Sequence, residues 1–464
     1  MEDNHLVADL AVIGGGAGAW TAMRVARNLG KRVVLFEDEH LGGTCVNVGC
    51  IPTKALVRSA EVVETIRNST RYGVAVSGFR VDFPAVMSRM RGIVQTSRSF
   101  YERAVAADPG VIWVPRTVHF TDPTCLEWEH GSLHFDHVII ASGTEAWWPP
   151  VPGIQQAGID STQLLELDAL PERLIICGAG VIATEFAQIF ARLGTKVTLV
   201  ARGLHILSNV DHDAVDVIER SLRRDGVRII HGTKAREARK NHEGWVELEI
   251  ERMDGQIETL HGDAMLVATG RIPKIDGLDL AAAGIDLDPT TGGPLVDREL
   301  RTTSPHAWAV GDSLGRLLYT HVANHEGPYA ARNALQDSHL RPDFYDEVPG
   351  AVFCDPELAT VGLRSDEAAE RGFDAVTGTY PMSRNGKARA MSKEDGFIRM
   401  VVERRTRKIL GATLVCQDAA NALQEILVAM AGDGTIAAIR KSIHTHPTIV
   451  EAVNACAREL ESQL

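Results

Sequence analysis

Apolar positions near the N-terminus follow two different spacings in succession. A continuous apolar run at 10–13 predicts a buried strand, and apolar residues at 22, 25, 26 and 29 then recur at helical spacing. Gly30 predicts the end of that helix, and the run "RVVLFE" at 32–37 predicts a second buried strand. This strand–helix–strand order is typical of a parallel α/β unit.

A glycine-rich turn joins the first strand to the helix. Gly14, Gly16 and Ala19 form the pattern G-x-G-x-x-A, which lets a pyrophosphate approach the backbone at a helix N-terminus. Glu37 follows Gly16 by about 20 residues and ends the second strand, where a carboxylate can accept hydrogen bonds from ribose hydroxyls. Strand, helix, second strand and acid together predict a dinucleotide site rather than a glycine turn without a ligand.

The same pattern returns in the middle of the chain, in "RLIICGAGVIATEFAQIFARLGTKVTLVAR" at 173–202. Gly178, Gly180 and Ala183 repeat the spacing of the first motif. Each copy is followed by an apolar strand with a small-residue turn, "VIIASG" ending at Gly143 and "MLVATG" ending at Gly270. We therefore expect two dinucleotide-binding folds in one chain, for two different dinucleotides.

The two copies differ at the end of their second strands. Where the first copy has Glu37, the second has Ala201 and Arg202. A carboxylate favours the free 2′-hydroxyl of NAD, whereas an arginine suits the 2′-phosphate of NADP. We expect NADP(H) to be preferred over NAD(H), with Arg202 as the phosphate contact and His205 as a second candidate; the alternative is an ordinary solvated arginine.

The second half of the chain adds one more candidate site motif, followed by a change in the pattern of predicted strands and helices. Gly311 and Asp312 end an apolar strand in "TTSPHAWAVGD", where an acid can hold a polyol or ribose hydroxyl or simply occupy a turn. The segment "DPTTGG" at 288–293 predicts a hairpin turn or loop. From about residue 345, alternating strands joined at "ERRTRKI" and two helices near 419–431 and 448–461 predict an α+β domain, with Cys456 in the core face of its last helix.

Composition narrows the class of protein. The 464 residues are 45% hydrophobic and carry a formal net charge of −13, which argues against a nucleic-acid-binding protein. We find no apolar run long enough for a membrane span and no secretory signal at the N-terminus. Seven cysteines in a chain of this length do not make a disulfide scaffold, so we expect a cytoplasmic protein in which any disulfide is catalytic.

Two of the cysteines, Cys45 and Cys50, lie close together in "GGTCVNVGCIPTK". Five helical steps rise about 7.5 Å, and a disulfide needs Cα atoms within about 6.8 Å, so pairing requires a loop or a distorted helix. A zinc site would need two further ligands, for which His444 and His446 are the tempting choices. A metal site, a structural disulfide, a redox pair and coincidence all remain open. We expect the other cysteines to be small buried hydrophobes: Cys125, Cys177, Cys354, Cys416 and Cys456.

The stretch from Gly42 to Lys54 resembles the redox-disulfide motif of the FAD-dependent pyridine nucleotide–disulfide oxidoreductases. That family includes dihydrolipoyl dehydrogenase, glutathione and mycothione reductases, and mercuric reductase. The resemblance covers essentially the whole chain through both glycine motifs, "AVGD", "VFCDPELATVGL" and "HTHPTIVEA". It implies an α/β fold with two Rossmann-like domains, for FAD and NAD(P)H, and a C-terminal α+β dimerisation domain. The expected boundaries are 1–147 and 271–340 for FAD, 148–270 for NAD(P)H and 341–464 for dimerisation.

The resemblance also implies roles for individual residues. Cys50 would be the flavin-proximal thiol and Cys45 the thiol that exchanges with substrate. Lys54 and Glu185 match a charged pair beside the flavin. His446 matches the catalytic base and Glu451 its orienting acid, with the histidine supplied by the partner subunit of a homodimer. The cofactor-binding residues are expected to be Gly14, Gly16, Ala19, Glu37, Gly43, Thr44, Lys54, Gly143, Gly311 and Asp312, together with Gly178, Gly180, Ala183, Arg202 and Gly270.

We thus expect an NAD(P)H:disulfide oxidoreductase similar to dihydrolipoyl dehydrogenase, without a resident metal, acting on a small disulfide, a dithiol or a lipoyl group. Alternatives are an NADPH-dependent reductase of the glutathione or mycothione type and a mercuric reductase. Ala201 and "AAN" at 419–421 depart from dihydrolipoyl dehydrogenases, and the single C-terminal cysteine departs from mercuric reductases. From other classes, a flavoprotein oxidase, a quinone reductase or a nucleotide-binding structural protein remain. The sequence leaves the electron acceptor and the direction of turnover open.

Overall fold

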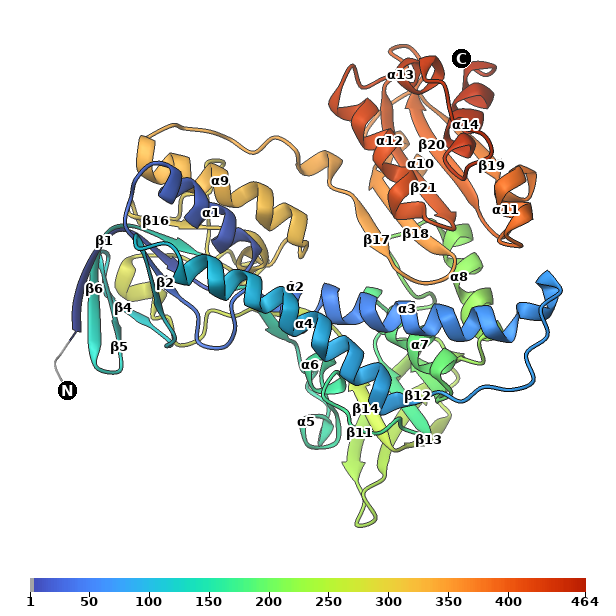
Figure 1. Ribbon diagram of the computed structural model, residues 1–464, viewed down its shortest axis with the longest axis horizontal. Helices are drawn as coiled ribbons and strands as arrows, with labels where there is room; N and C mark the ends of the chain where they lie inside the picture. Colours follow the sequence, from blue (N-terminus) through green and yellow to red (C-terminus); the bar gives the residue numbers. More distant parts are fainter. Residues whose placement is uncertain (1–3) are drawn as a thin grey trace.

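A seven-stranded sheet forms the N-terminal part of the protein (Figure 1). The computed structural model describes residues 4–464. The strand order is β3-β2-β1-β6-β5-β4, and β16 pairs with β6 although it lies far along the chain. The parallel strands are β1 (Asn4–Ile13), β2 (Val33–Phe36), β3 (Val111–Val114), β6 (Gly131–Ile140) and β16 (Ala307–Ala309), and the antiparallel ones are β4 (His119–Asp122) and β5 (Cys125–Trp128).

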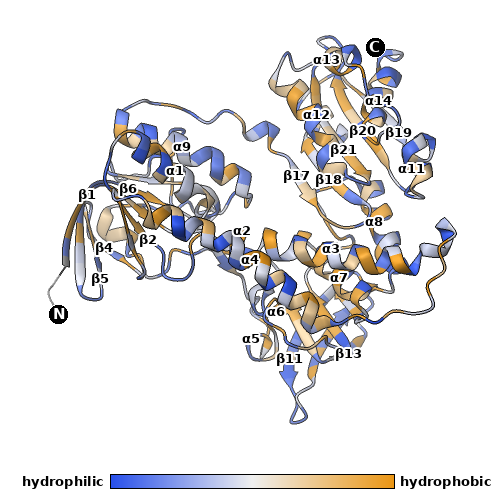
Figure 2. Ribbon diagram, in the orientation of Figure 1, coloured by the Kyte–Doolittle hydropathy of each residue, from blue (hydrophilic) through white to orange (hydrophobic). Residues whose placement is uncertain are grey.

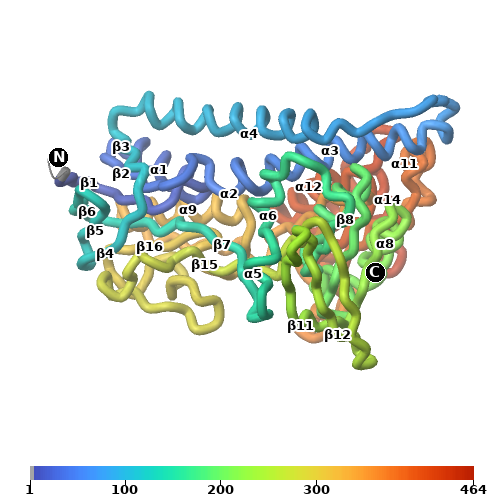
Figure 3. The backbone as a smooth tube through the Cα atoms, turned by 90° about the horizontal axis from the view of Figure 1, so that it is seen from below, coloured from blue at the N-terminus to red at the C-terminus, as the bar shows by residue number. Residues whose placement is uncertain are grey.

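Long helices cover this sheet and extend away from it. Helix α1 (Ala17–Asn28) connects β1 to β2, as the periodicity predicts, and packs against α9 (Thr320–Gln336). The two helices approach closely at Gly327, where a Cβ atom would lie 2.3 Å from Oγ1 of Thr21. Helices α3 (Cys50–Arg67) and α4 (Phe83–Ala106) run side by side and reach toward the rest of the molecule (Figure 3).

The second glycine motif lies in a separate four-stranded parallel sheet of order β10-β9-β8-β14. Two parallel α/β units in one chain are therefore confirmed. Its elements are β8 (Arg173–Cys177), α7 (Val181–Leu193), β9 (Lys196–Val200), α8 (His212–Arg224), β10 (Arg228–Ile230) and β14 (Ala264–Val267). An antiparallel sheet of β11 (Thr233–Lys240), β12 (Val246–Arg252) and β13 (Ile257–Gly262) lies beside it, and β7 (Thr144–Ala146) pairs with β15 (Arg271–Pro273) where the chain enters and leaves. Short helices α5 (Ile154–Ala157) and α6 (Ser161–Leu164) precede β8.

The C-terminal part is an antiparallel five-stranded sheet of order β17-β18-β21-β20-β19. Its elements are β17 (Gly350–Val352), β18 (Glu357–Gly362), α10 (Ser365–Glu370), β19 (Ala375–Pro381), α11 (Gly386–Ala390), β20 (Phe397–Glu403), β21 (Ile409–Cys416), α12 (Ala419–Ala431), α13 (Ile436–Lys441) and α14 (Glu451–Glu461). The predicted turns at 403–409 and 288–293 and the helix at 419–431 are confirmed. The last helix begins at Glu451, three residues after the predicted start near 448, and Thr448 and Glu451 exchange hydrogen bonds across the turn that precedes it.

Apolar side chains fill the interior of each sheet layer (Figure 2). The C-terminal halves of β1 and β6, residues 10–13 and 138–140, are buried on both faces, as the continuous apolar run at 10–13 predicts for β1. The cysteines outside the Cys45–Cys50 stretch are buried as expected: Cys125, Cys177, Cys354, Cys416 and Cys456. Within residues 4–464, no helix combines the length and apolar character needed to cross a membrane.

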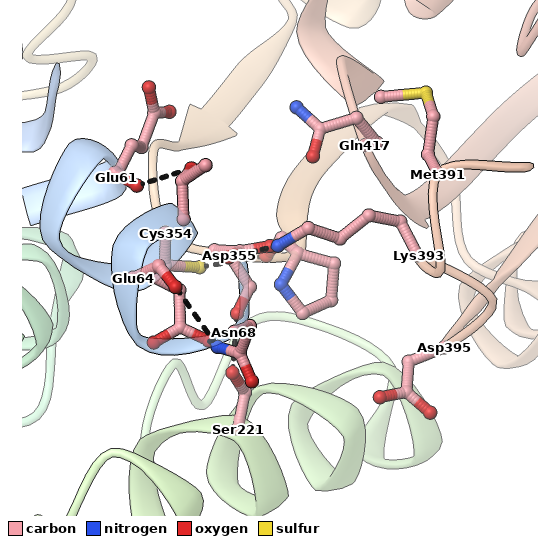
Figure 4. Close-up of polar contacts among 12 residues, drawn as sticks. Glu61, Glu64, Asn68, Ser221, Cys354, Asp355, Met391, Lys393, Asp395 and Gln417 are labelled. Carbon is pink, nitrogen blue, oxygen red and sulfur yellow. Dashed lines mark hydrogen bonds and ion pairs between the residues drawn. The ribbon is translucent and has the colours of Figure 1, made fainter. Parts of the chain in front are cut away.

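A buried ion cluster at Asp355 joins the second sheet's helices to the C-terminal part (Figure 4). Arg192 of α7 is 4% exposed and its guanidinium lies 2.8 Å from Asp355 and 2.9 Å from Asp225. Lys393 reaches the same Asp355 carboxylate at 2.5 Å from the C-terminal part. Burial alone would raise the pKa of Asp355, but the two cations hold this pKa below its ordinary value. The cluster therefore fixes the two parts against each other through paired charges.

We predict that Asp355→Asn lowers the free energy of unfolding at pH 7 by about 3 kcal/mol, because it leaves buried cations without their partner. The folded-state pKa of Asp355 is depressed, so its contribution is present above the ordinary aspartate pKa and is lost as the pH falls. Urea unfolding at pH 7 and pH 3 should show the gap between wild type and variant closing at the lower pH. Asp168→Asn, at a carboxylate that is 90% exposed, is the control and should cost less than about 0.5 kcal/mol. Equal losses in the two variants would contradict the role of the cluster.

Candidate functional site

The carboxyl ends of four parallel strands bring the first group of site residues to one edge of the sheet. Gly14 follows β1, Glu37 follows β2, Gly143 lies just beyond β6, and Gly311 and Asp312 follow β16. Segments about 300 residues apart in the sequence thus meet at one place, because parallel strands end at a common edge. Ligands of open α/β sheets bind at such an edge.

Backbone segments approach each other closely at the glycine turn. Gly14 has φ +101°, and a Cβ atom there would lie 2.3 Å from the carbonyl oxygen of Ala141. Gly43 has φ +60°, and its Cβ would lie 2.6 Å from Cα of Gly16. Any side chain would push these segments apart. The turn beneath the first motif and the segment that carries the cysteines are therefore packed backbone against backbone.

Polar groups at this edge fit a dinucleotide such as FAD. Glu37 accepts a hydrogen bond of 2.8 Å from the Gly15 amide, and burial raises the pKa of its carboxyl. Burial also raises the pKa of Asp312 to about 6, against the opposing charge of Arg271. Among the described residues, the buried Ser142 hydroxyl has no hydrogen-bond partner, which fits a polar ligand beside Gly14. Ser142 is not among the site residues predicted from the sequence, although it is the serine of "VIIASG".

The second sheet repeats the same construction. Gly178, with φ +137°, would place a Cβ 2.2 Å from the carbonyl oxygen of Ala268, as Gly14 does against Ala141. Gly180 precedes α7, and a Cβ there would meet no atom within 4 Å. Ala201, directly after β9, takes the position of Glu37, and Arg202 beside it is exposed. The remaining motif positions are Ala19 and Ala183, buried in α1 and α7, Gly16 before α1, Thr44, exposed in α2 (Gly43–Asn47), and Gly270 after β14.

The cysteine pair spans a break between two helices. Cys45 lies in α2 and Cys50 is the first residue of α3, so the two residues do not share one regular helix, which is the condition that a disulfide between them would require. Both are free thiols, and Cys50 Sγ lies 3.7 Å from the Thr320 hydroxyl at the start of α9. Within the described chain, no group of three or more His, Cys, Asp or Glu side chains is arranged to hold a metal ion.

Electrostatics favour the thiolate at Cys50 rather than at Cys45. A hydrogen bond from Cys45 lowers the pKa of Cys50 to about 6, with help from Thr320 and the charge of Lys54 against the effect of burial. The same hydrogen bond, together with burial, raises the pKa of Cys45. Cys50 also begins an 18-residue helix, whose N-terminal dipole stabilises an anion. One thiolate and one thiol are therefore held side by side.

An ion pair fixes Lys54 one turn after Cys50. Its Nζ lies 3.1 and 2.9 Å from the two carboxylate oxygens of Glu185 in α7. The Glu185 side chain is only 4% exposed. Glu185 also accepts a hydrogen bond of 2.9 Å from the Phe353 amide, and Lys54 Nζ lies 4.3 Å from the centre of the Phe353 ring. Helix α3, helix α7 and the segment that follows β17 therefore meet at Lys54, one turn from Cys50.

An aromatic group lies on the other side of the cysteine pair. Burial and the nearby charge of Cys45 raise the pKa of Tyr101 in α4. Its ring contacts Trp20 of α1 with centroids 4.8 Å apart, and Phe100 at 5.4 Å. Phe100 is 57% exposed. No local pattern marks Tyr101 in the sequence, so its position next to Cys45 appears only in the structure.

His446 and Glu451 form a dyad at the far end of the same chain. His446 Nδ1 lies 2.8 Å from Glu451 Oε1, which leaves Nε2 as the nitrogen for proton transfer. The His446 side chain is 79% exposed. Its loop joins α13 to α14, and both helices lie far from α2 in the two views (Figures 1 and 3). A single chain therefore does not bring the dyad to the cysteines.

Comparison with known proteins agrees over the whole chain. The family model for pyridine nucleotide-disulphide oxidoreductase matches residues 8–336, and the model for the dimerisation domain of that family matches 348–457. A dihydrolipoyl dehydrogenase of Chlamydia pneumoniae is 33% identical over 96% of this chain and 95% of its own, and a mercuric reductase of Streptomyces lividans is 32% identical over 100% and 98%. The HOCl-induced flavoprotein disulfide reductase RclA of Escherichia coli superposes with a TM-score of 0.88 at 30% identity, covering 97% of this chain and 99% of that one.

We predict that one thiol of the reduced protein titrates with a midpoint near pH 6, because its neighbours lower the pKa of Cys50. The thiolate should be present above that midpoint, and Lys54→Met should move the midpoint up by about one pH unit by removing the nearby cation. Ultraviolet thiolate absorbance as a function of pH measures both. The step should vanish in Cys50→Ser and persist in Cys125→Ser, the matched buried cysteine. A first midpoint at pH 8 or above would refute the assignment.

Proposed function

The chain belongs to the pyridine nucleotide-disulphide oxidoreductase family, and from that premise we propose that it is an FAD-dependent NADPH:disulfide oxidoreductase acting on a small disulfide or dithiol. As a family member it is a flavin-dependent oxidoreductase that acts on sulfur groups. The observation that carries the finer proposal is the thiol–thiolate pair of Cys45 and Cys50 packed against the first glycine turn. Such a pair can alternate between dithiol and disulfide.

We assign residues 1–147 and 271–340 to FAD binding, 148–270 to NAD(P)H binding and 341–464 to dimerisation. The pairing of β16 with β6 supports the return of the chain to the first domain after residue 270. FAD would be held by the edge that carries Gly14, Glu37 and Asp312, with Gly43, Thr44 and Lys54 contributed by the cysteine segment. Bound there, FAD supplies a two-electron carrier between NADPH and the Cys45–Cys50 disulfide.

The protein's own residues then perform thiol–disulfide exchange. Two electrons break the Cys45–Cys50 bond, and Lys54 and the start of α3 stabilise the resulting Cys50 thiolate. Cys45 attacks a substrate disulfide, its proton passes to His446, a mixed disulfide forms, and the departing thiolate takes that proton back. Cys50 then attacks Cys45, which re-forms the enzyme disulfide and releases the second thiolate. One NADPH and one proton thus convert one disulfide to two thiols.

We propose that His446 and Glu451 act on the cysteines of a second copy in a homodimer. The dimerisation-domain match to 348–457 supports an assembly of two chains. Exposed apolar side chains near the dyad, Ile443 and Val428, support a protein partner at this face. In a two-fold dimer each chain would give its dyad to the other chain's cysteines, so both sites are equivalent.

Ala201 and Arg202 support NADPH over NADH. Ala201 removes the carboxylate that would repel a 2′-phosphate, and Arg202 is exposed beside it. Dihydrolipoyl dehydrogenase relatives favour lipoyl chemistry, so a lipoyl group remains within the proposed substrate class. A cytoplasmic location remains a prediction.

Reduction of a metal ion is the second candidate function. A mercuric reductase is among the relatives, and the RclA structures include a Cu(II) complex. Two observations favour disulfides instead. The His446–Glu451 dyad supplies the acid–base chemistry of thiol exchange, and the single C-terminal cysteine, Cys456, is fully buried and cannot hand an ion to the site.

We predict that kcat/KM is at least tenfold higher with NADPH than with NADH. Arg202→Ala should lower kcat/KM for NADPH by roughly 10- to 100-fold, the value of a hydrogen bond to a charged group, and leave NADH nearly unchanged. Steady-state kinetics with either cofactor and a panel of lipoamide, glutathione disulfide, mycothiol-type disulfide and Hg²⁺ measure this and identify the acceptor. Arg220→Ala, at an exposed arginine of the same domain, is the control. A higher efficiency with NADH would overturn the cofactor assignment.

We predict that Cys45→Ser and His446→Gln homodimers are each nearly inactive in disulfide reduction and complement each other. After subunit exchange, half of the dimers contain one chain of each kind, and each of these has one intact site, so about a quarter of wild-type activity should return. Activity after mixing under exchange conditions measures it, with the two variants mixed without exchange as the control. If the dyad served its own chain, no activity would return.

A further inference from the structure

His444 lies two residues before His446 but has the opposite environment. Its side chain is 10% exposed, against 79% for His446. Nε2 of His444 lies 2.7 Å from Oε1 of Glu425 in α12, and Nδ1 lies 2.8 Å from the side-chain nitrogen of Asn454 in α14. Nδ1 also lies 3.2 Å from the Ser442 carbonyl oxygen. Both ring nitrogens therefore have polar partners, and these contacts fix the orientation of the ring.

These contacts tie the 442–448 loop to three helices. His444 links the loop to α12 and α14, and Arg440 of α13 donates to the Asn454 carbonyl oxygen, which fixes the orientation of that amide. At the other end of the loop, the buried Asn385 donates to the Thr448 carbonyl at 3.0 Å. The loop is therefore held on both sides of His446 while His446 itself projects outward.

The buried position of the Glu425 carboxylate is energetically unfavourable for its charged form. Burial raises its pKa, His444 opposes that rise, and the second oxygen of Glu425 has no hydrogen-bond partner among the described residues. A buried carboxylate of this kind is destabilising unless its partner compensates. Burial would raise the pKa of Glu451, but hydrogen bonds from Thr448 and His446 hold it low, with a smaller contribution from His444 when that imidazole is protonated. The buried pair thus lies within electrostatic range of the dyad.

We propose that His444 and Glu425 are a positioning pair that fixes the 442–448 loop so that His446 is presented to Cys45 of a second copy. This inference rests on the proposed function, which gives His446 its target. Ile443, directly before His444, is fully exposed, so the loop exposes an apolar side chain as well as the His446 imidazole. A displacement of about 1 Å can cost a catalytic group two orders of magnitude, so a loop that carries the base requires firm anchors.

Alkylation of the reduced, FAD-loaded dimer by iodoacetamide tests the pair without any knowledge of the substrate. The rate at Cys45, resolved from Cys50 by peptide mass spectrometry, reports the imidazole beside Cys45, because only a thiolate reacts. His446→Gln defines the rate without that imidazole. We expect His444→Leu and Glu425→Leu to lower the Cys45 rate roughly tenfold and to remove its dependence on an imidazole pKa. Cys50 should alkylate at the wild-type rate in every variant.

Conservative replacements separate positioning from general stability. Glutamine at 444 keeps an N–H in place of Nε2, and glutamine at 425 keeps an acceptor, so His444→Gln and Glu425→Gln should stay within about threefold of wild type. His339→Leu, which removes a similar His–Glu pair outside the loop, should change nothing. Wild-type Cys45 rates in His444→Leu, or loss of the dimer in that variant, would refute positioning. If His446→Gln itself leaves Cys45 unchanged, the composite site of the proposed function fails instead.

Discussion

The contact of Gly43 with Gly16 is the constraint on which the site depends. Two backbones meet where a single Cβ would lie 2.6 Å from the neighbouring Cα, so the cysteine segment cannot move away from the first glycine turn without losing its packing. The same approach places Cys50 at the start of α3 and at the edge where the parallel strands end. The cysteine segment and the edge where the parallel strands end are thereby packed as one unit.

The charged and polar groups around the cysteines give Cys45 and Cys50 different pKa values. Cys50 lies at a helix N-terminus, beside the Thr320 hydroxyl and one turn from Lys54, and Lys54 is held by a carboxylate that is itself almost fully buried. Thr320 and Lys54 also act on Cys45, but its hydrogen bond to Cys50 and its burial outweigh them and raise its pKa. The asymmetry therefore favours the anion at Cys50, and in the exchange that we propose Cys45 is the sulfur that attacks the substrate.

Local patterns predict the frame of the fold, and long-range packing supplies the rest. The sequence allowed us to predict the two glycine motifs, Glu37 and Ala201, because a strand–turn–helix unit is encoded within about 30 residues. Tyr101 and Asp355 could not be predicted, since their partners lie on segments far away in the sequence, and no local pattern marks the Ser142 hydroxyl. The last helix begins three residues later than predicted, after a turn in which Thr448 and Glu451 exchange hydrogen bonds. His444 was visible as a histidine, but only the fold separates its buried role from the exposed role of His446.

The exposed dyad would link dimerisation to catalysis in the composite site that we propose. His446 is 79% exposed and is hydrogen-bonded through Nδ1 to Glu451, and its own chain does not bring the dyad to the cysteines. Burial against a partner would bring Nε2 to a sulfur and would lower the local dielectric in which Glu451 stabilises the charged ring. In that proposal the acid–base function belongs to the interface rather than to the fold of one chain. The anchors of the 442–448 loop, rather than the dyad alone, would then set how accurately one chain completes the site of the other.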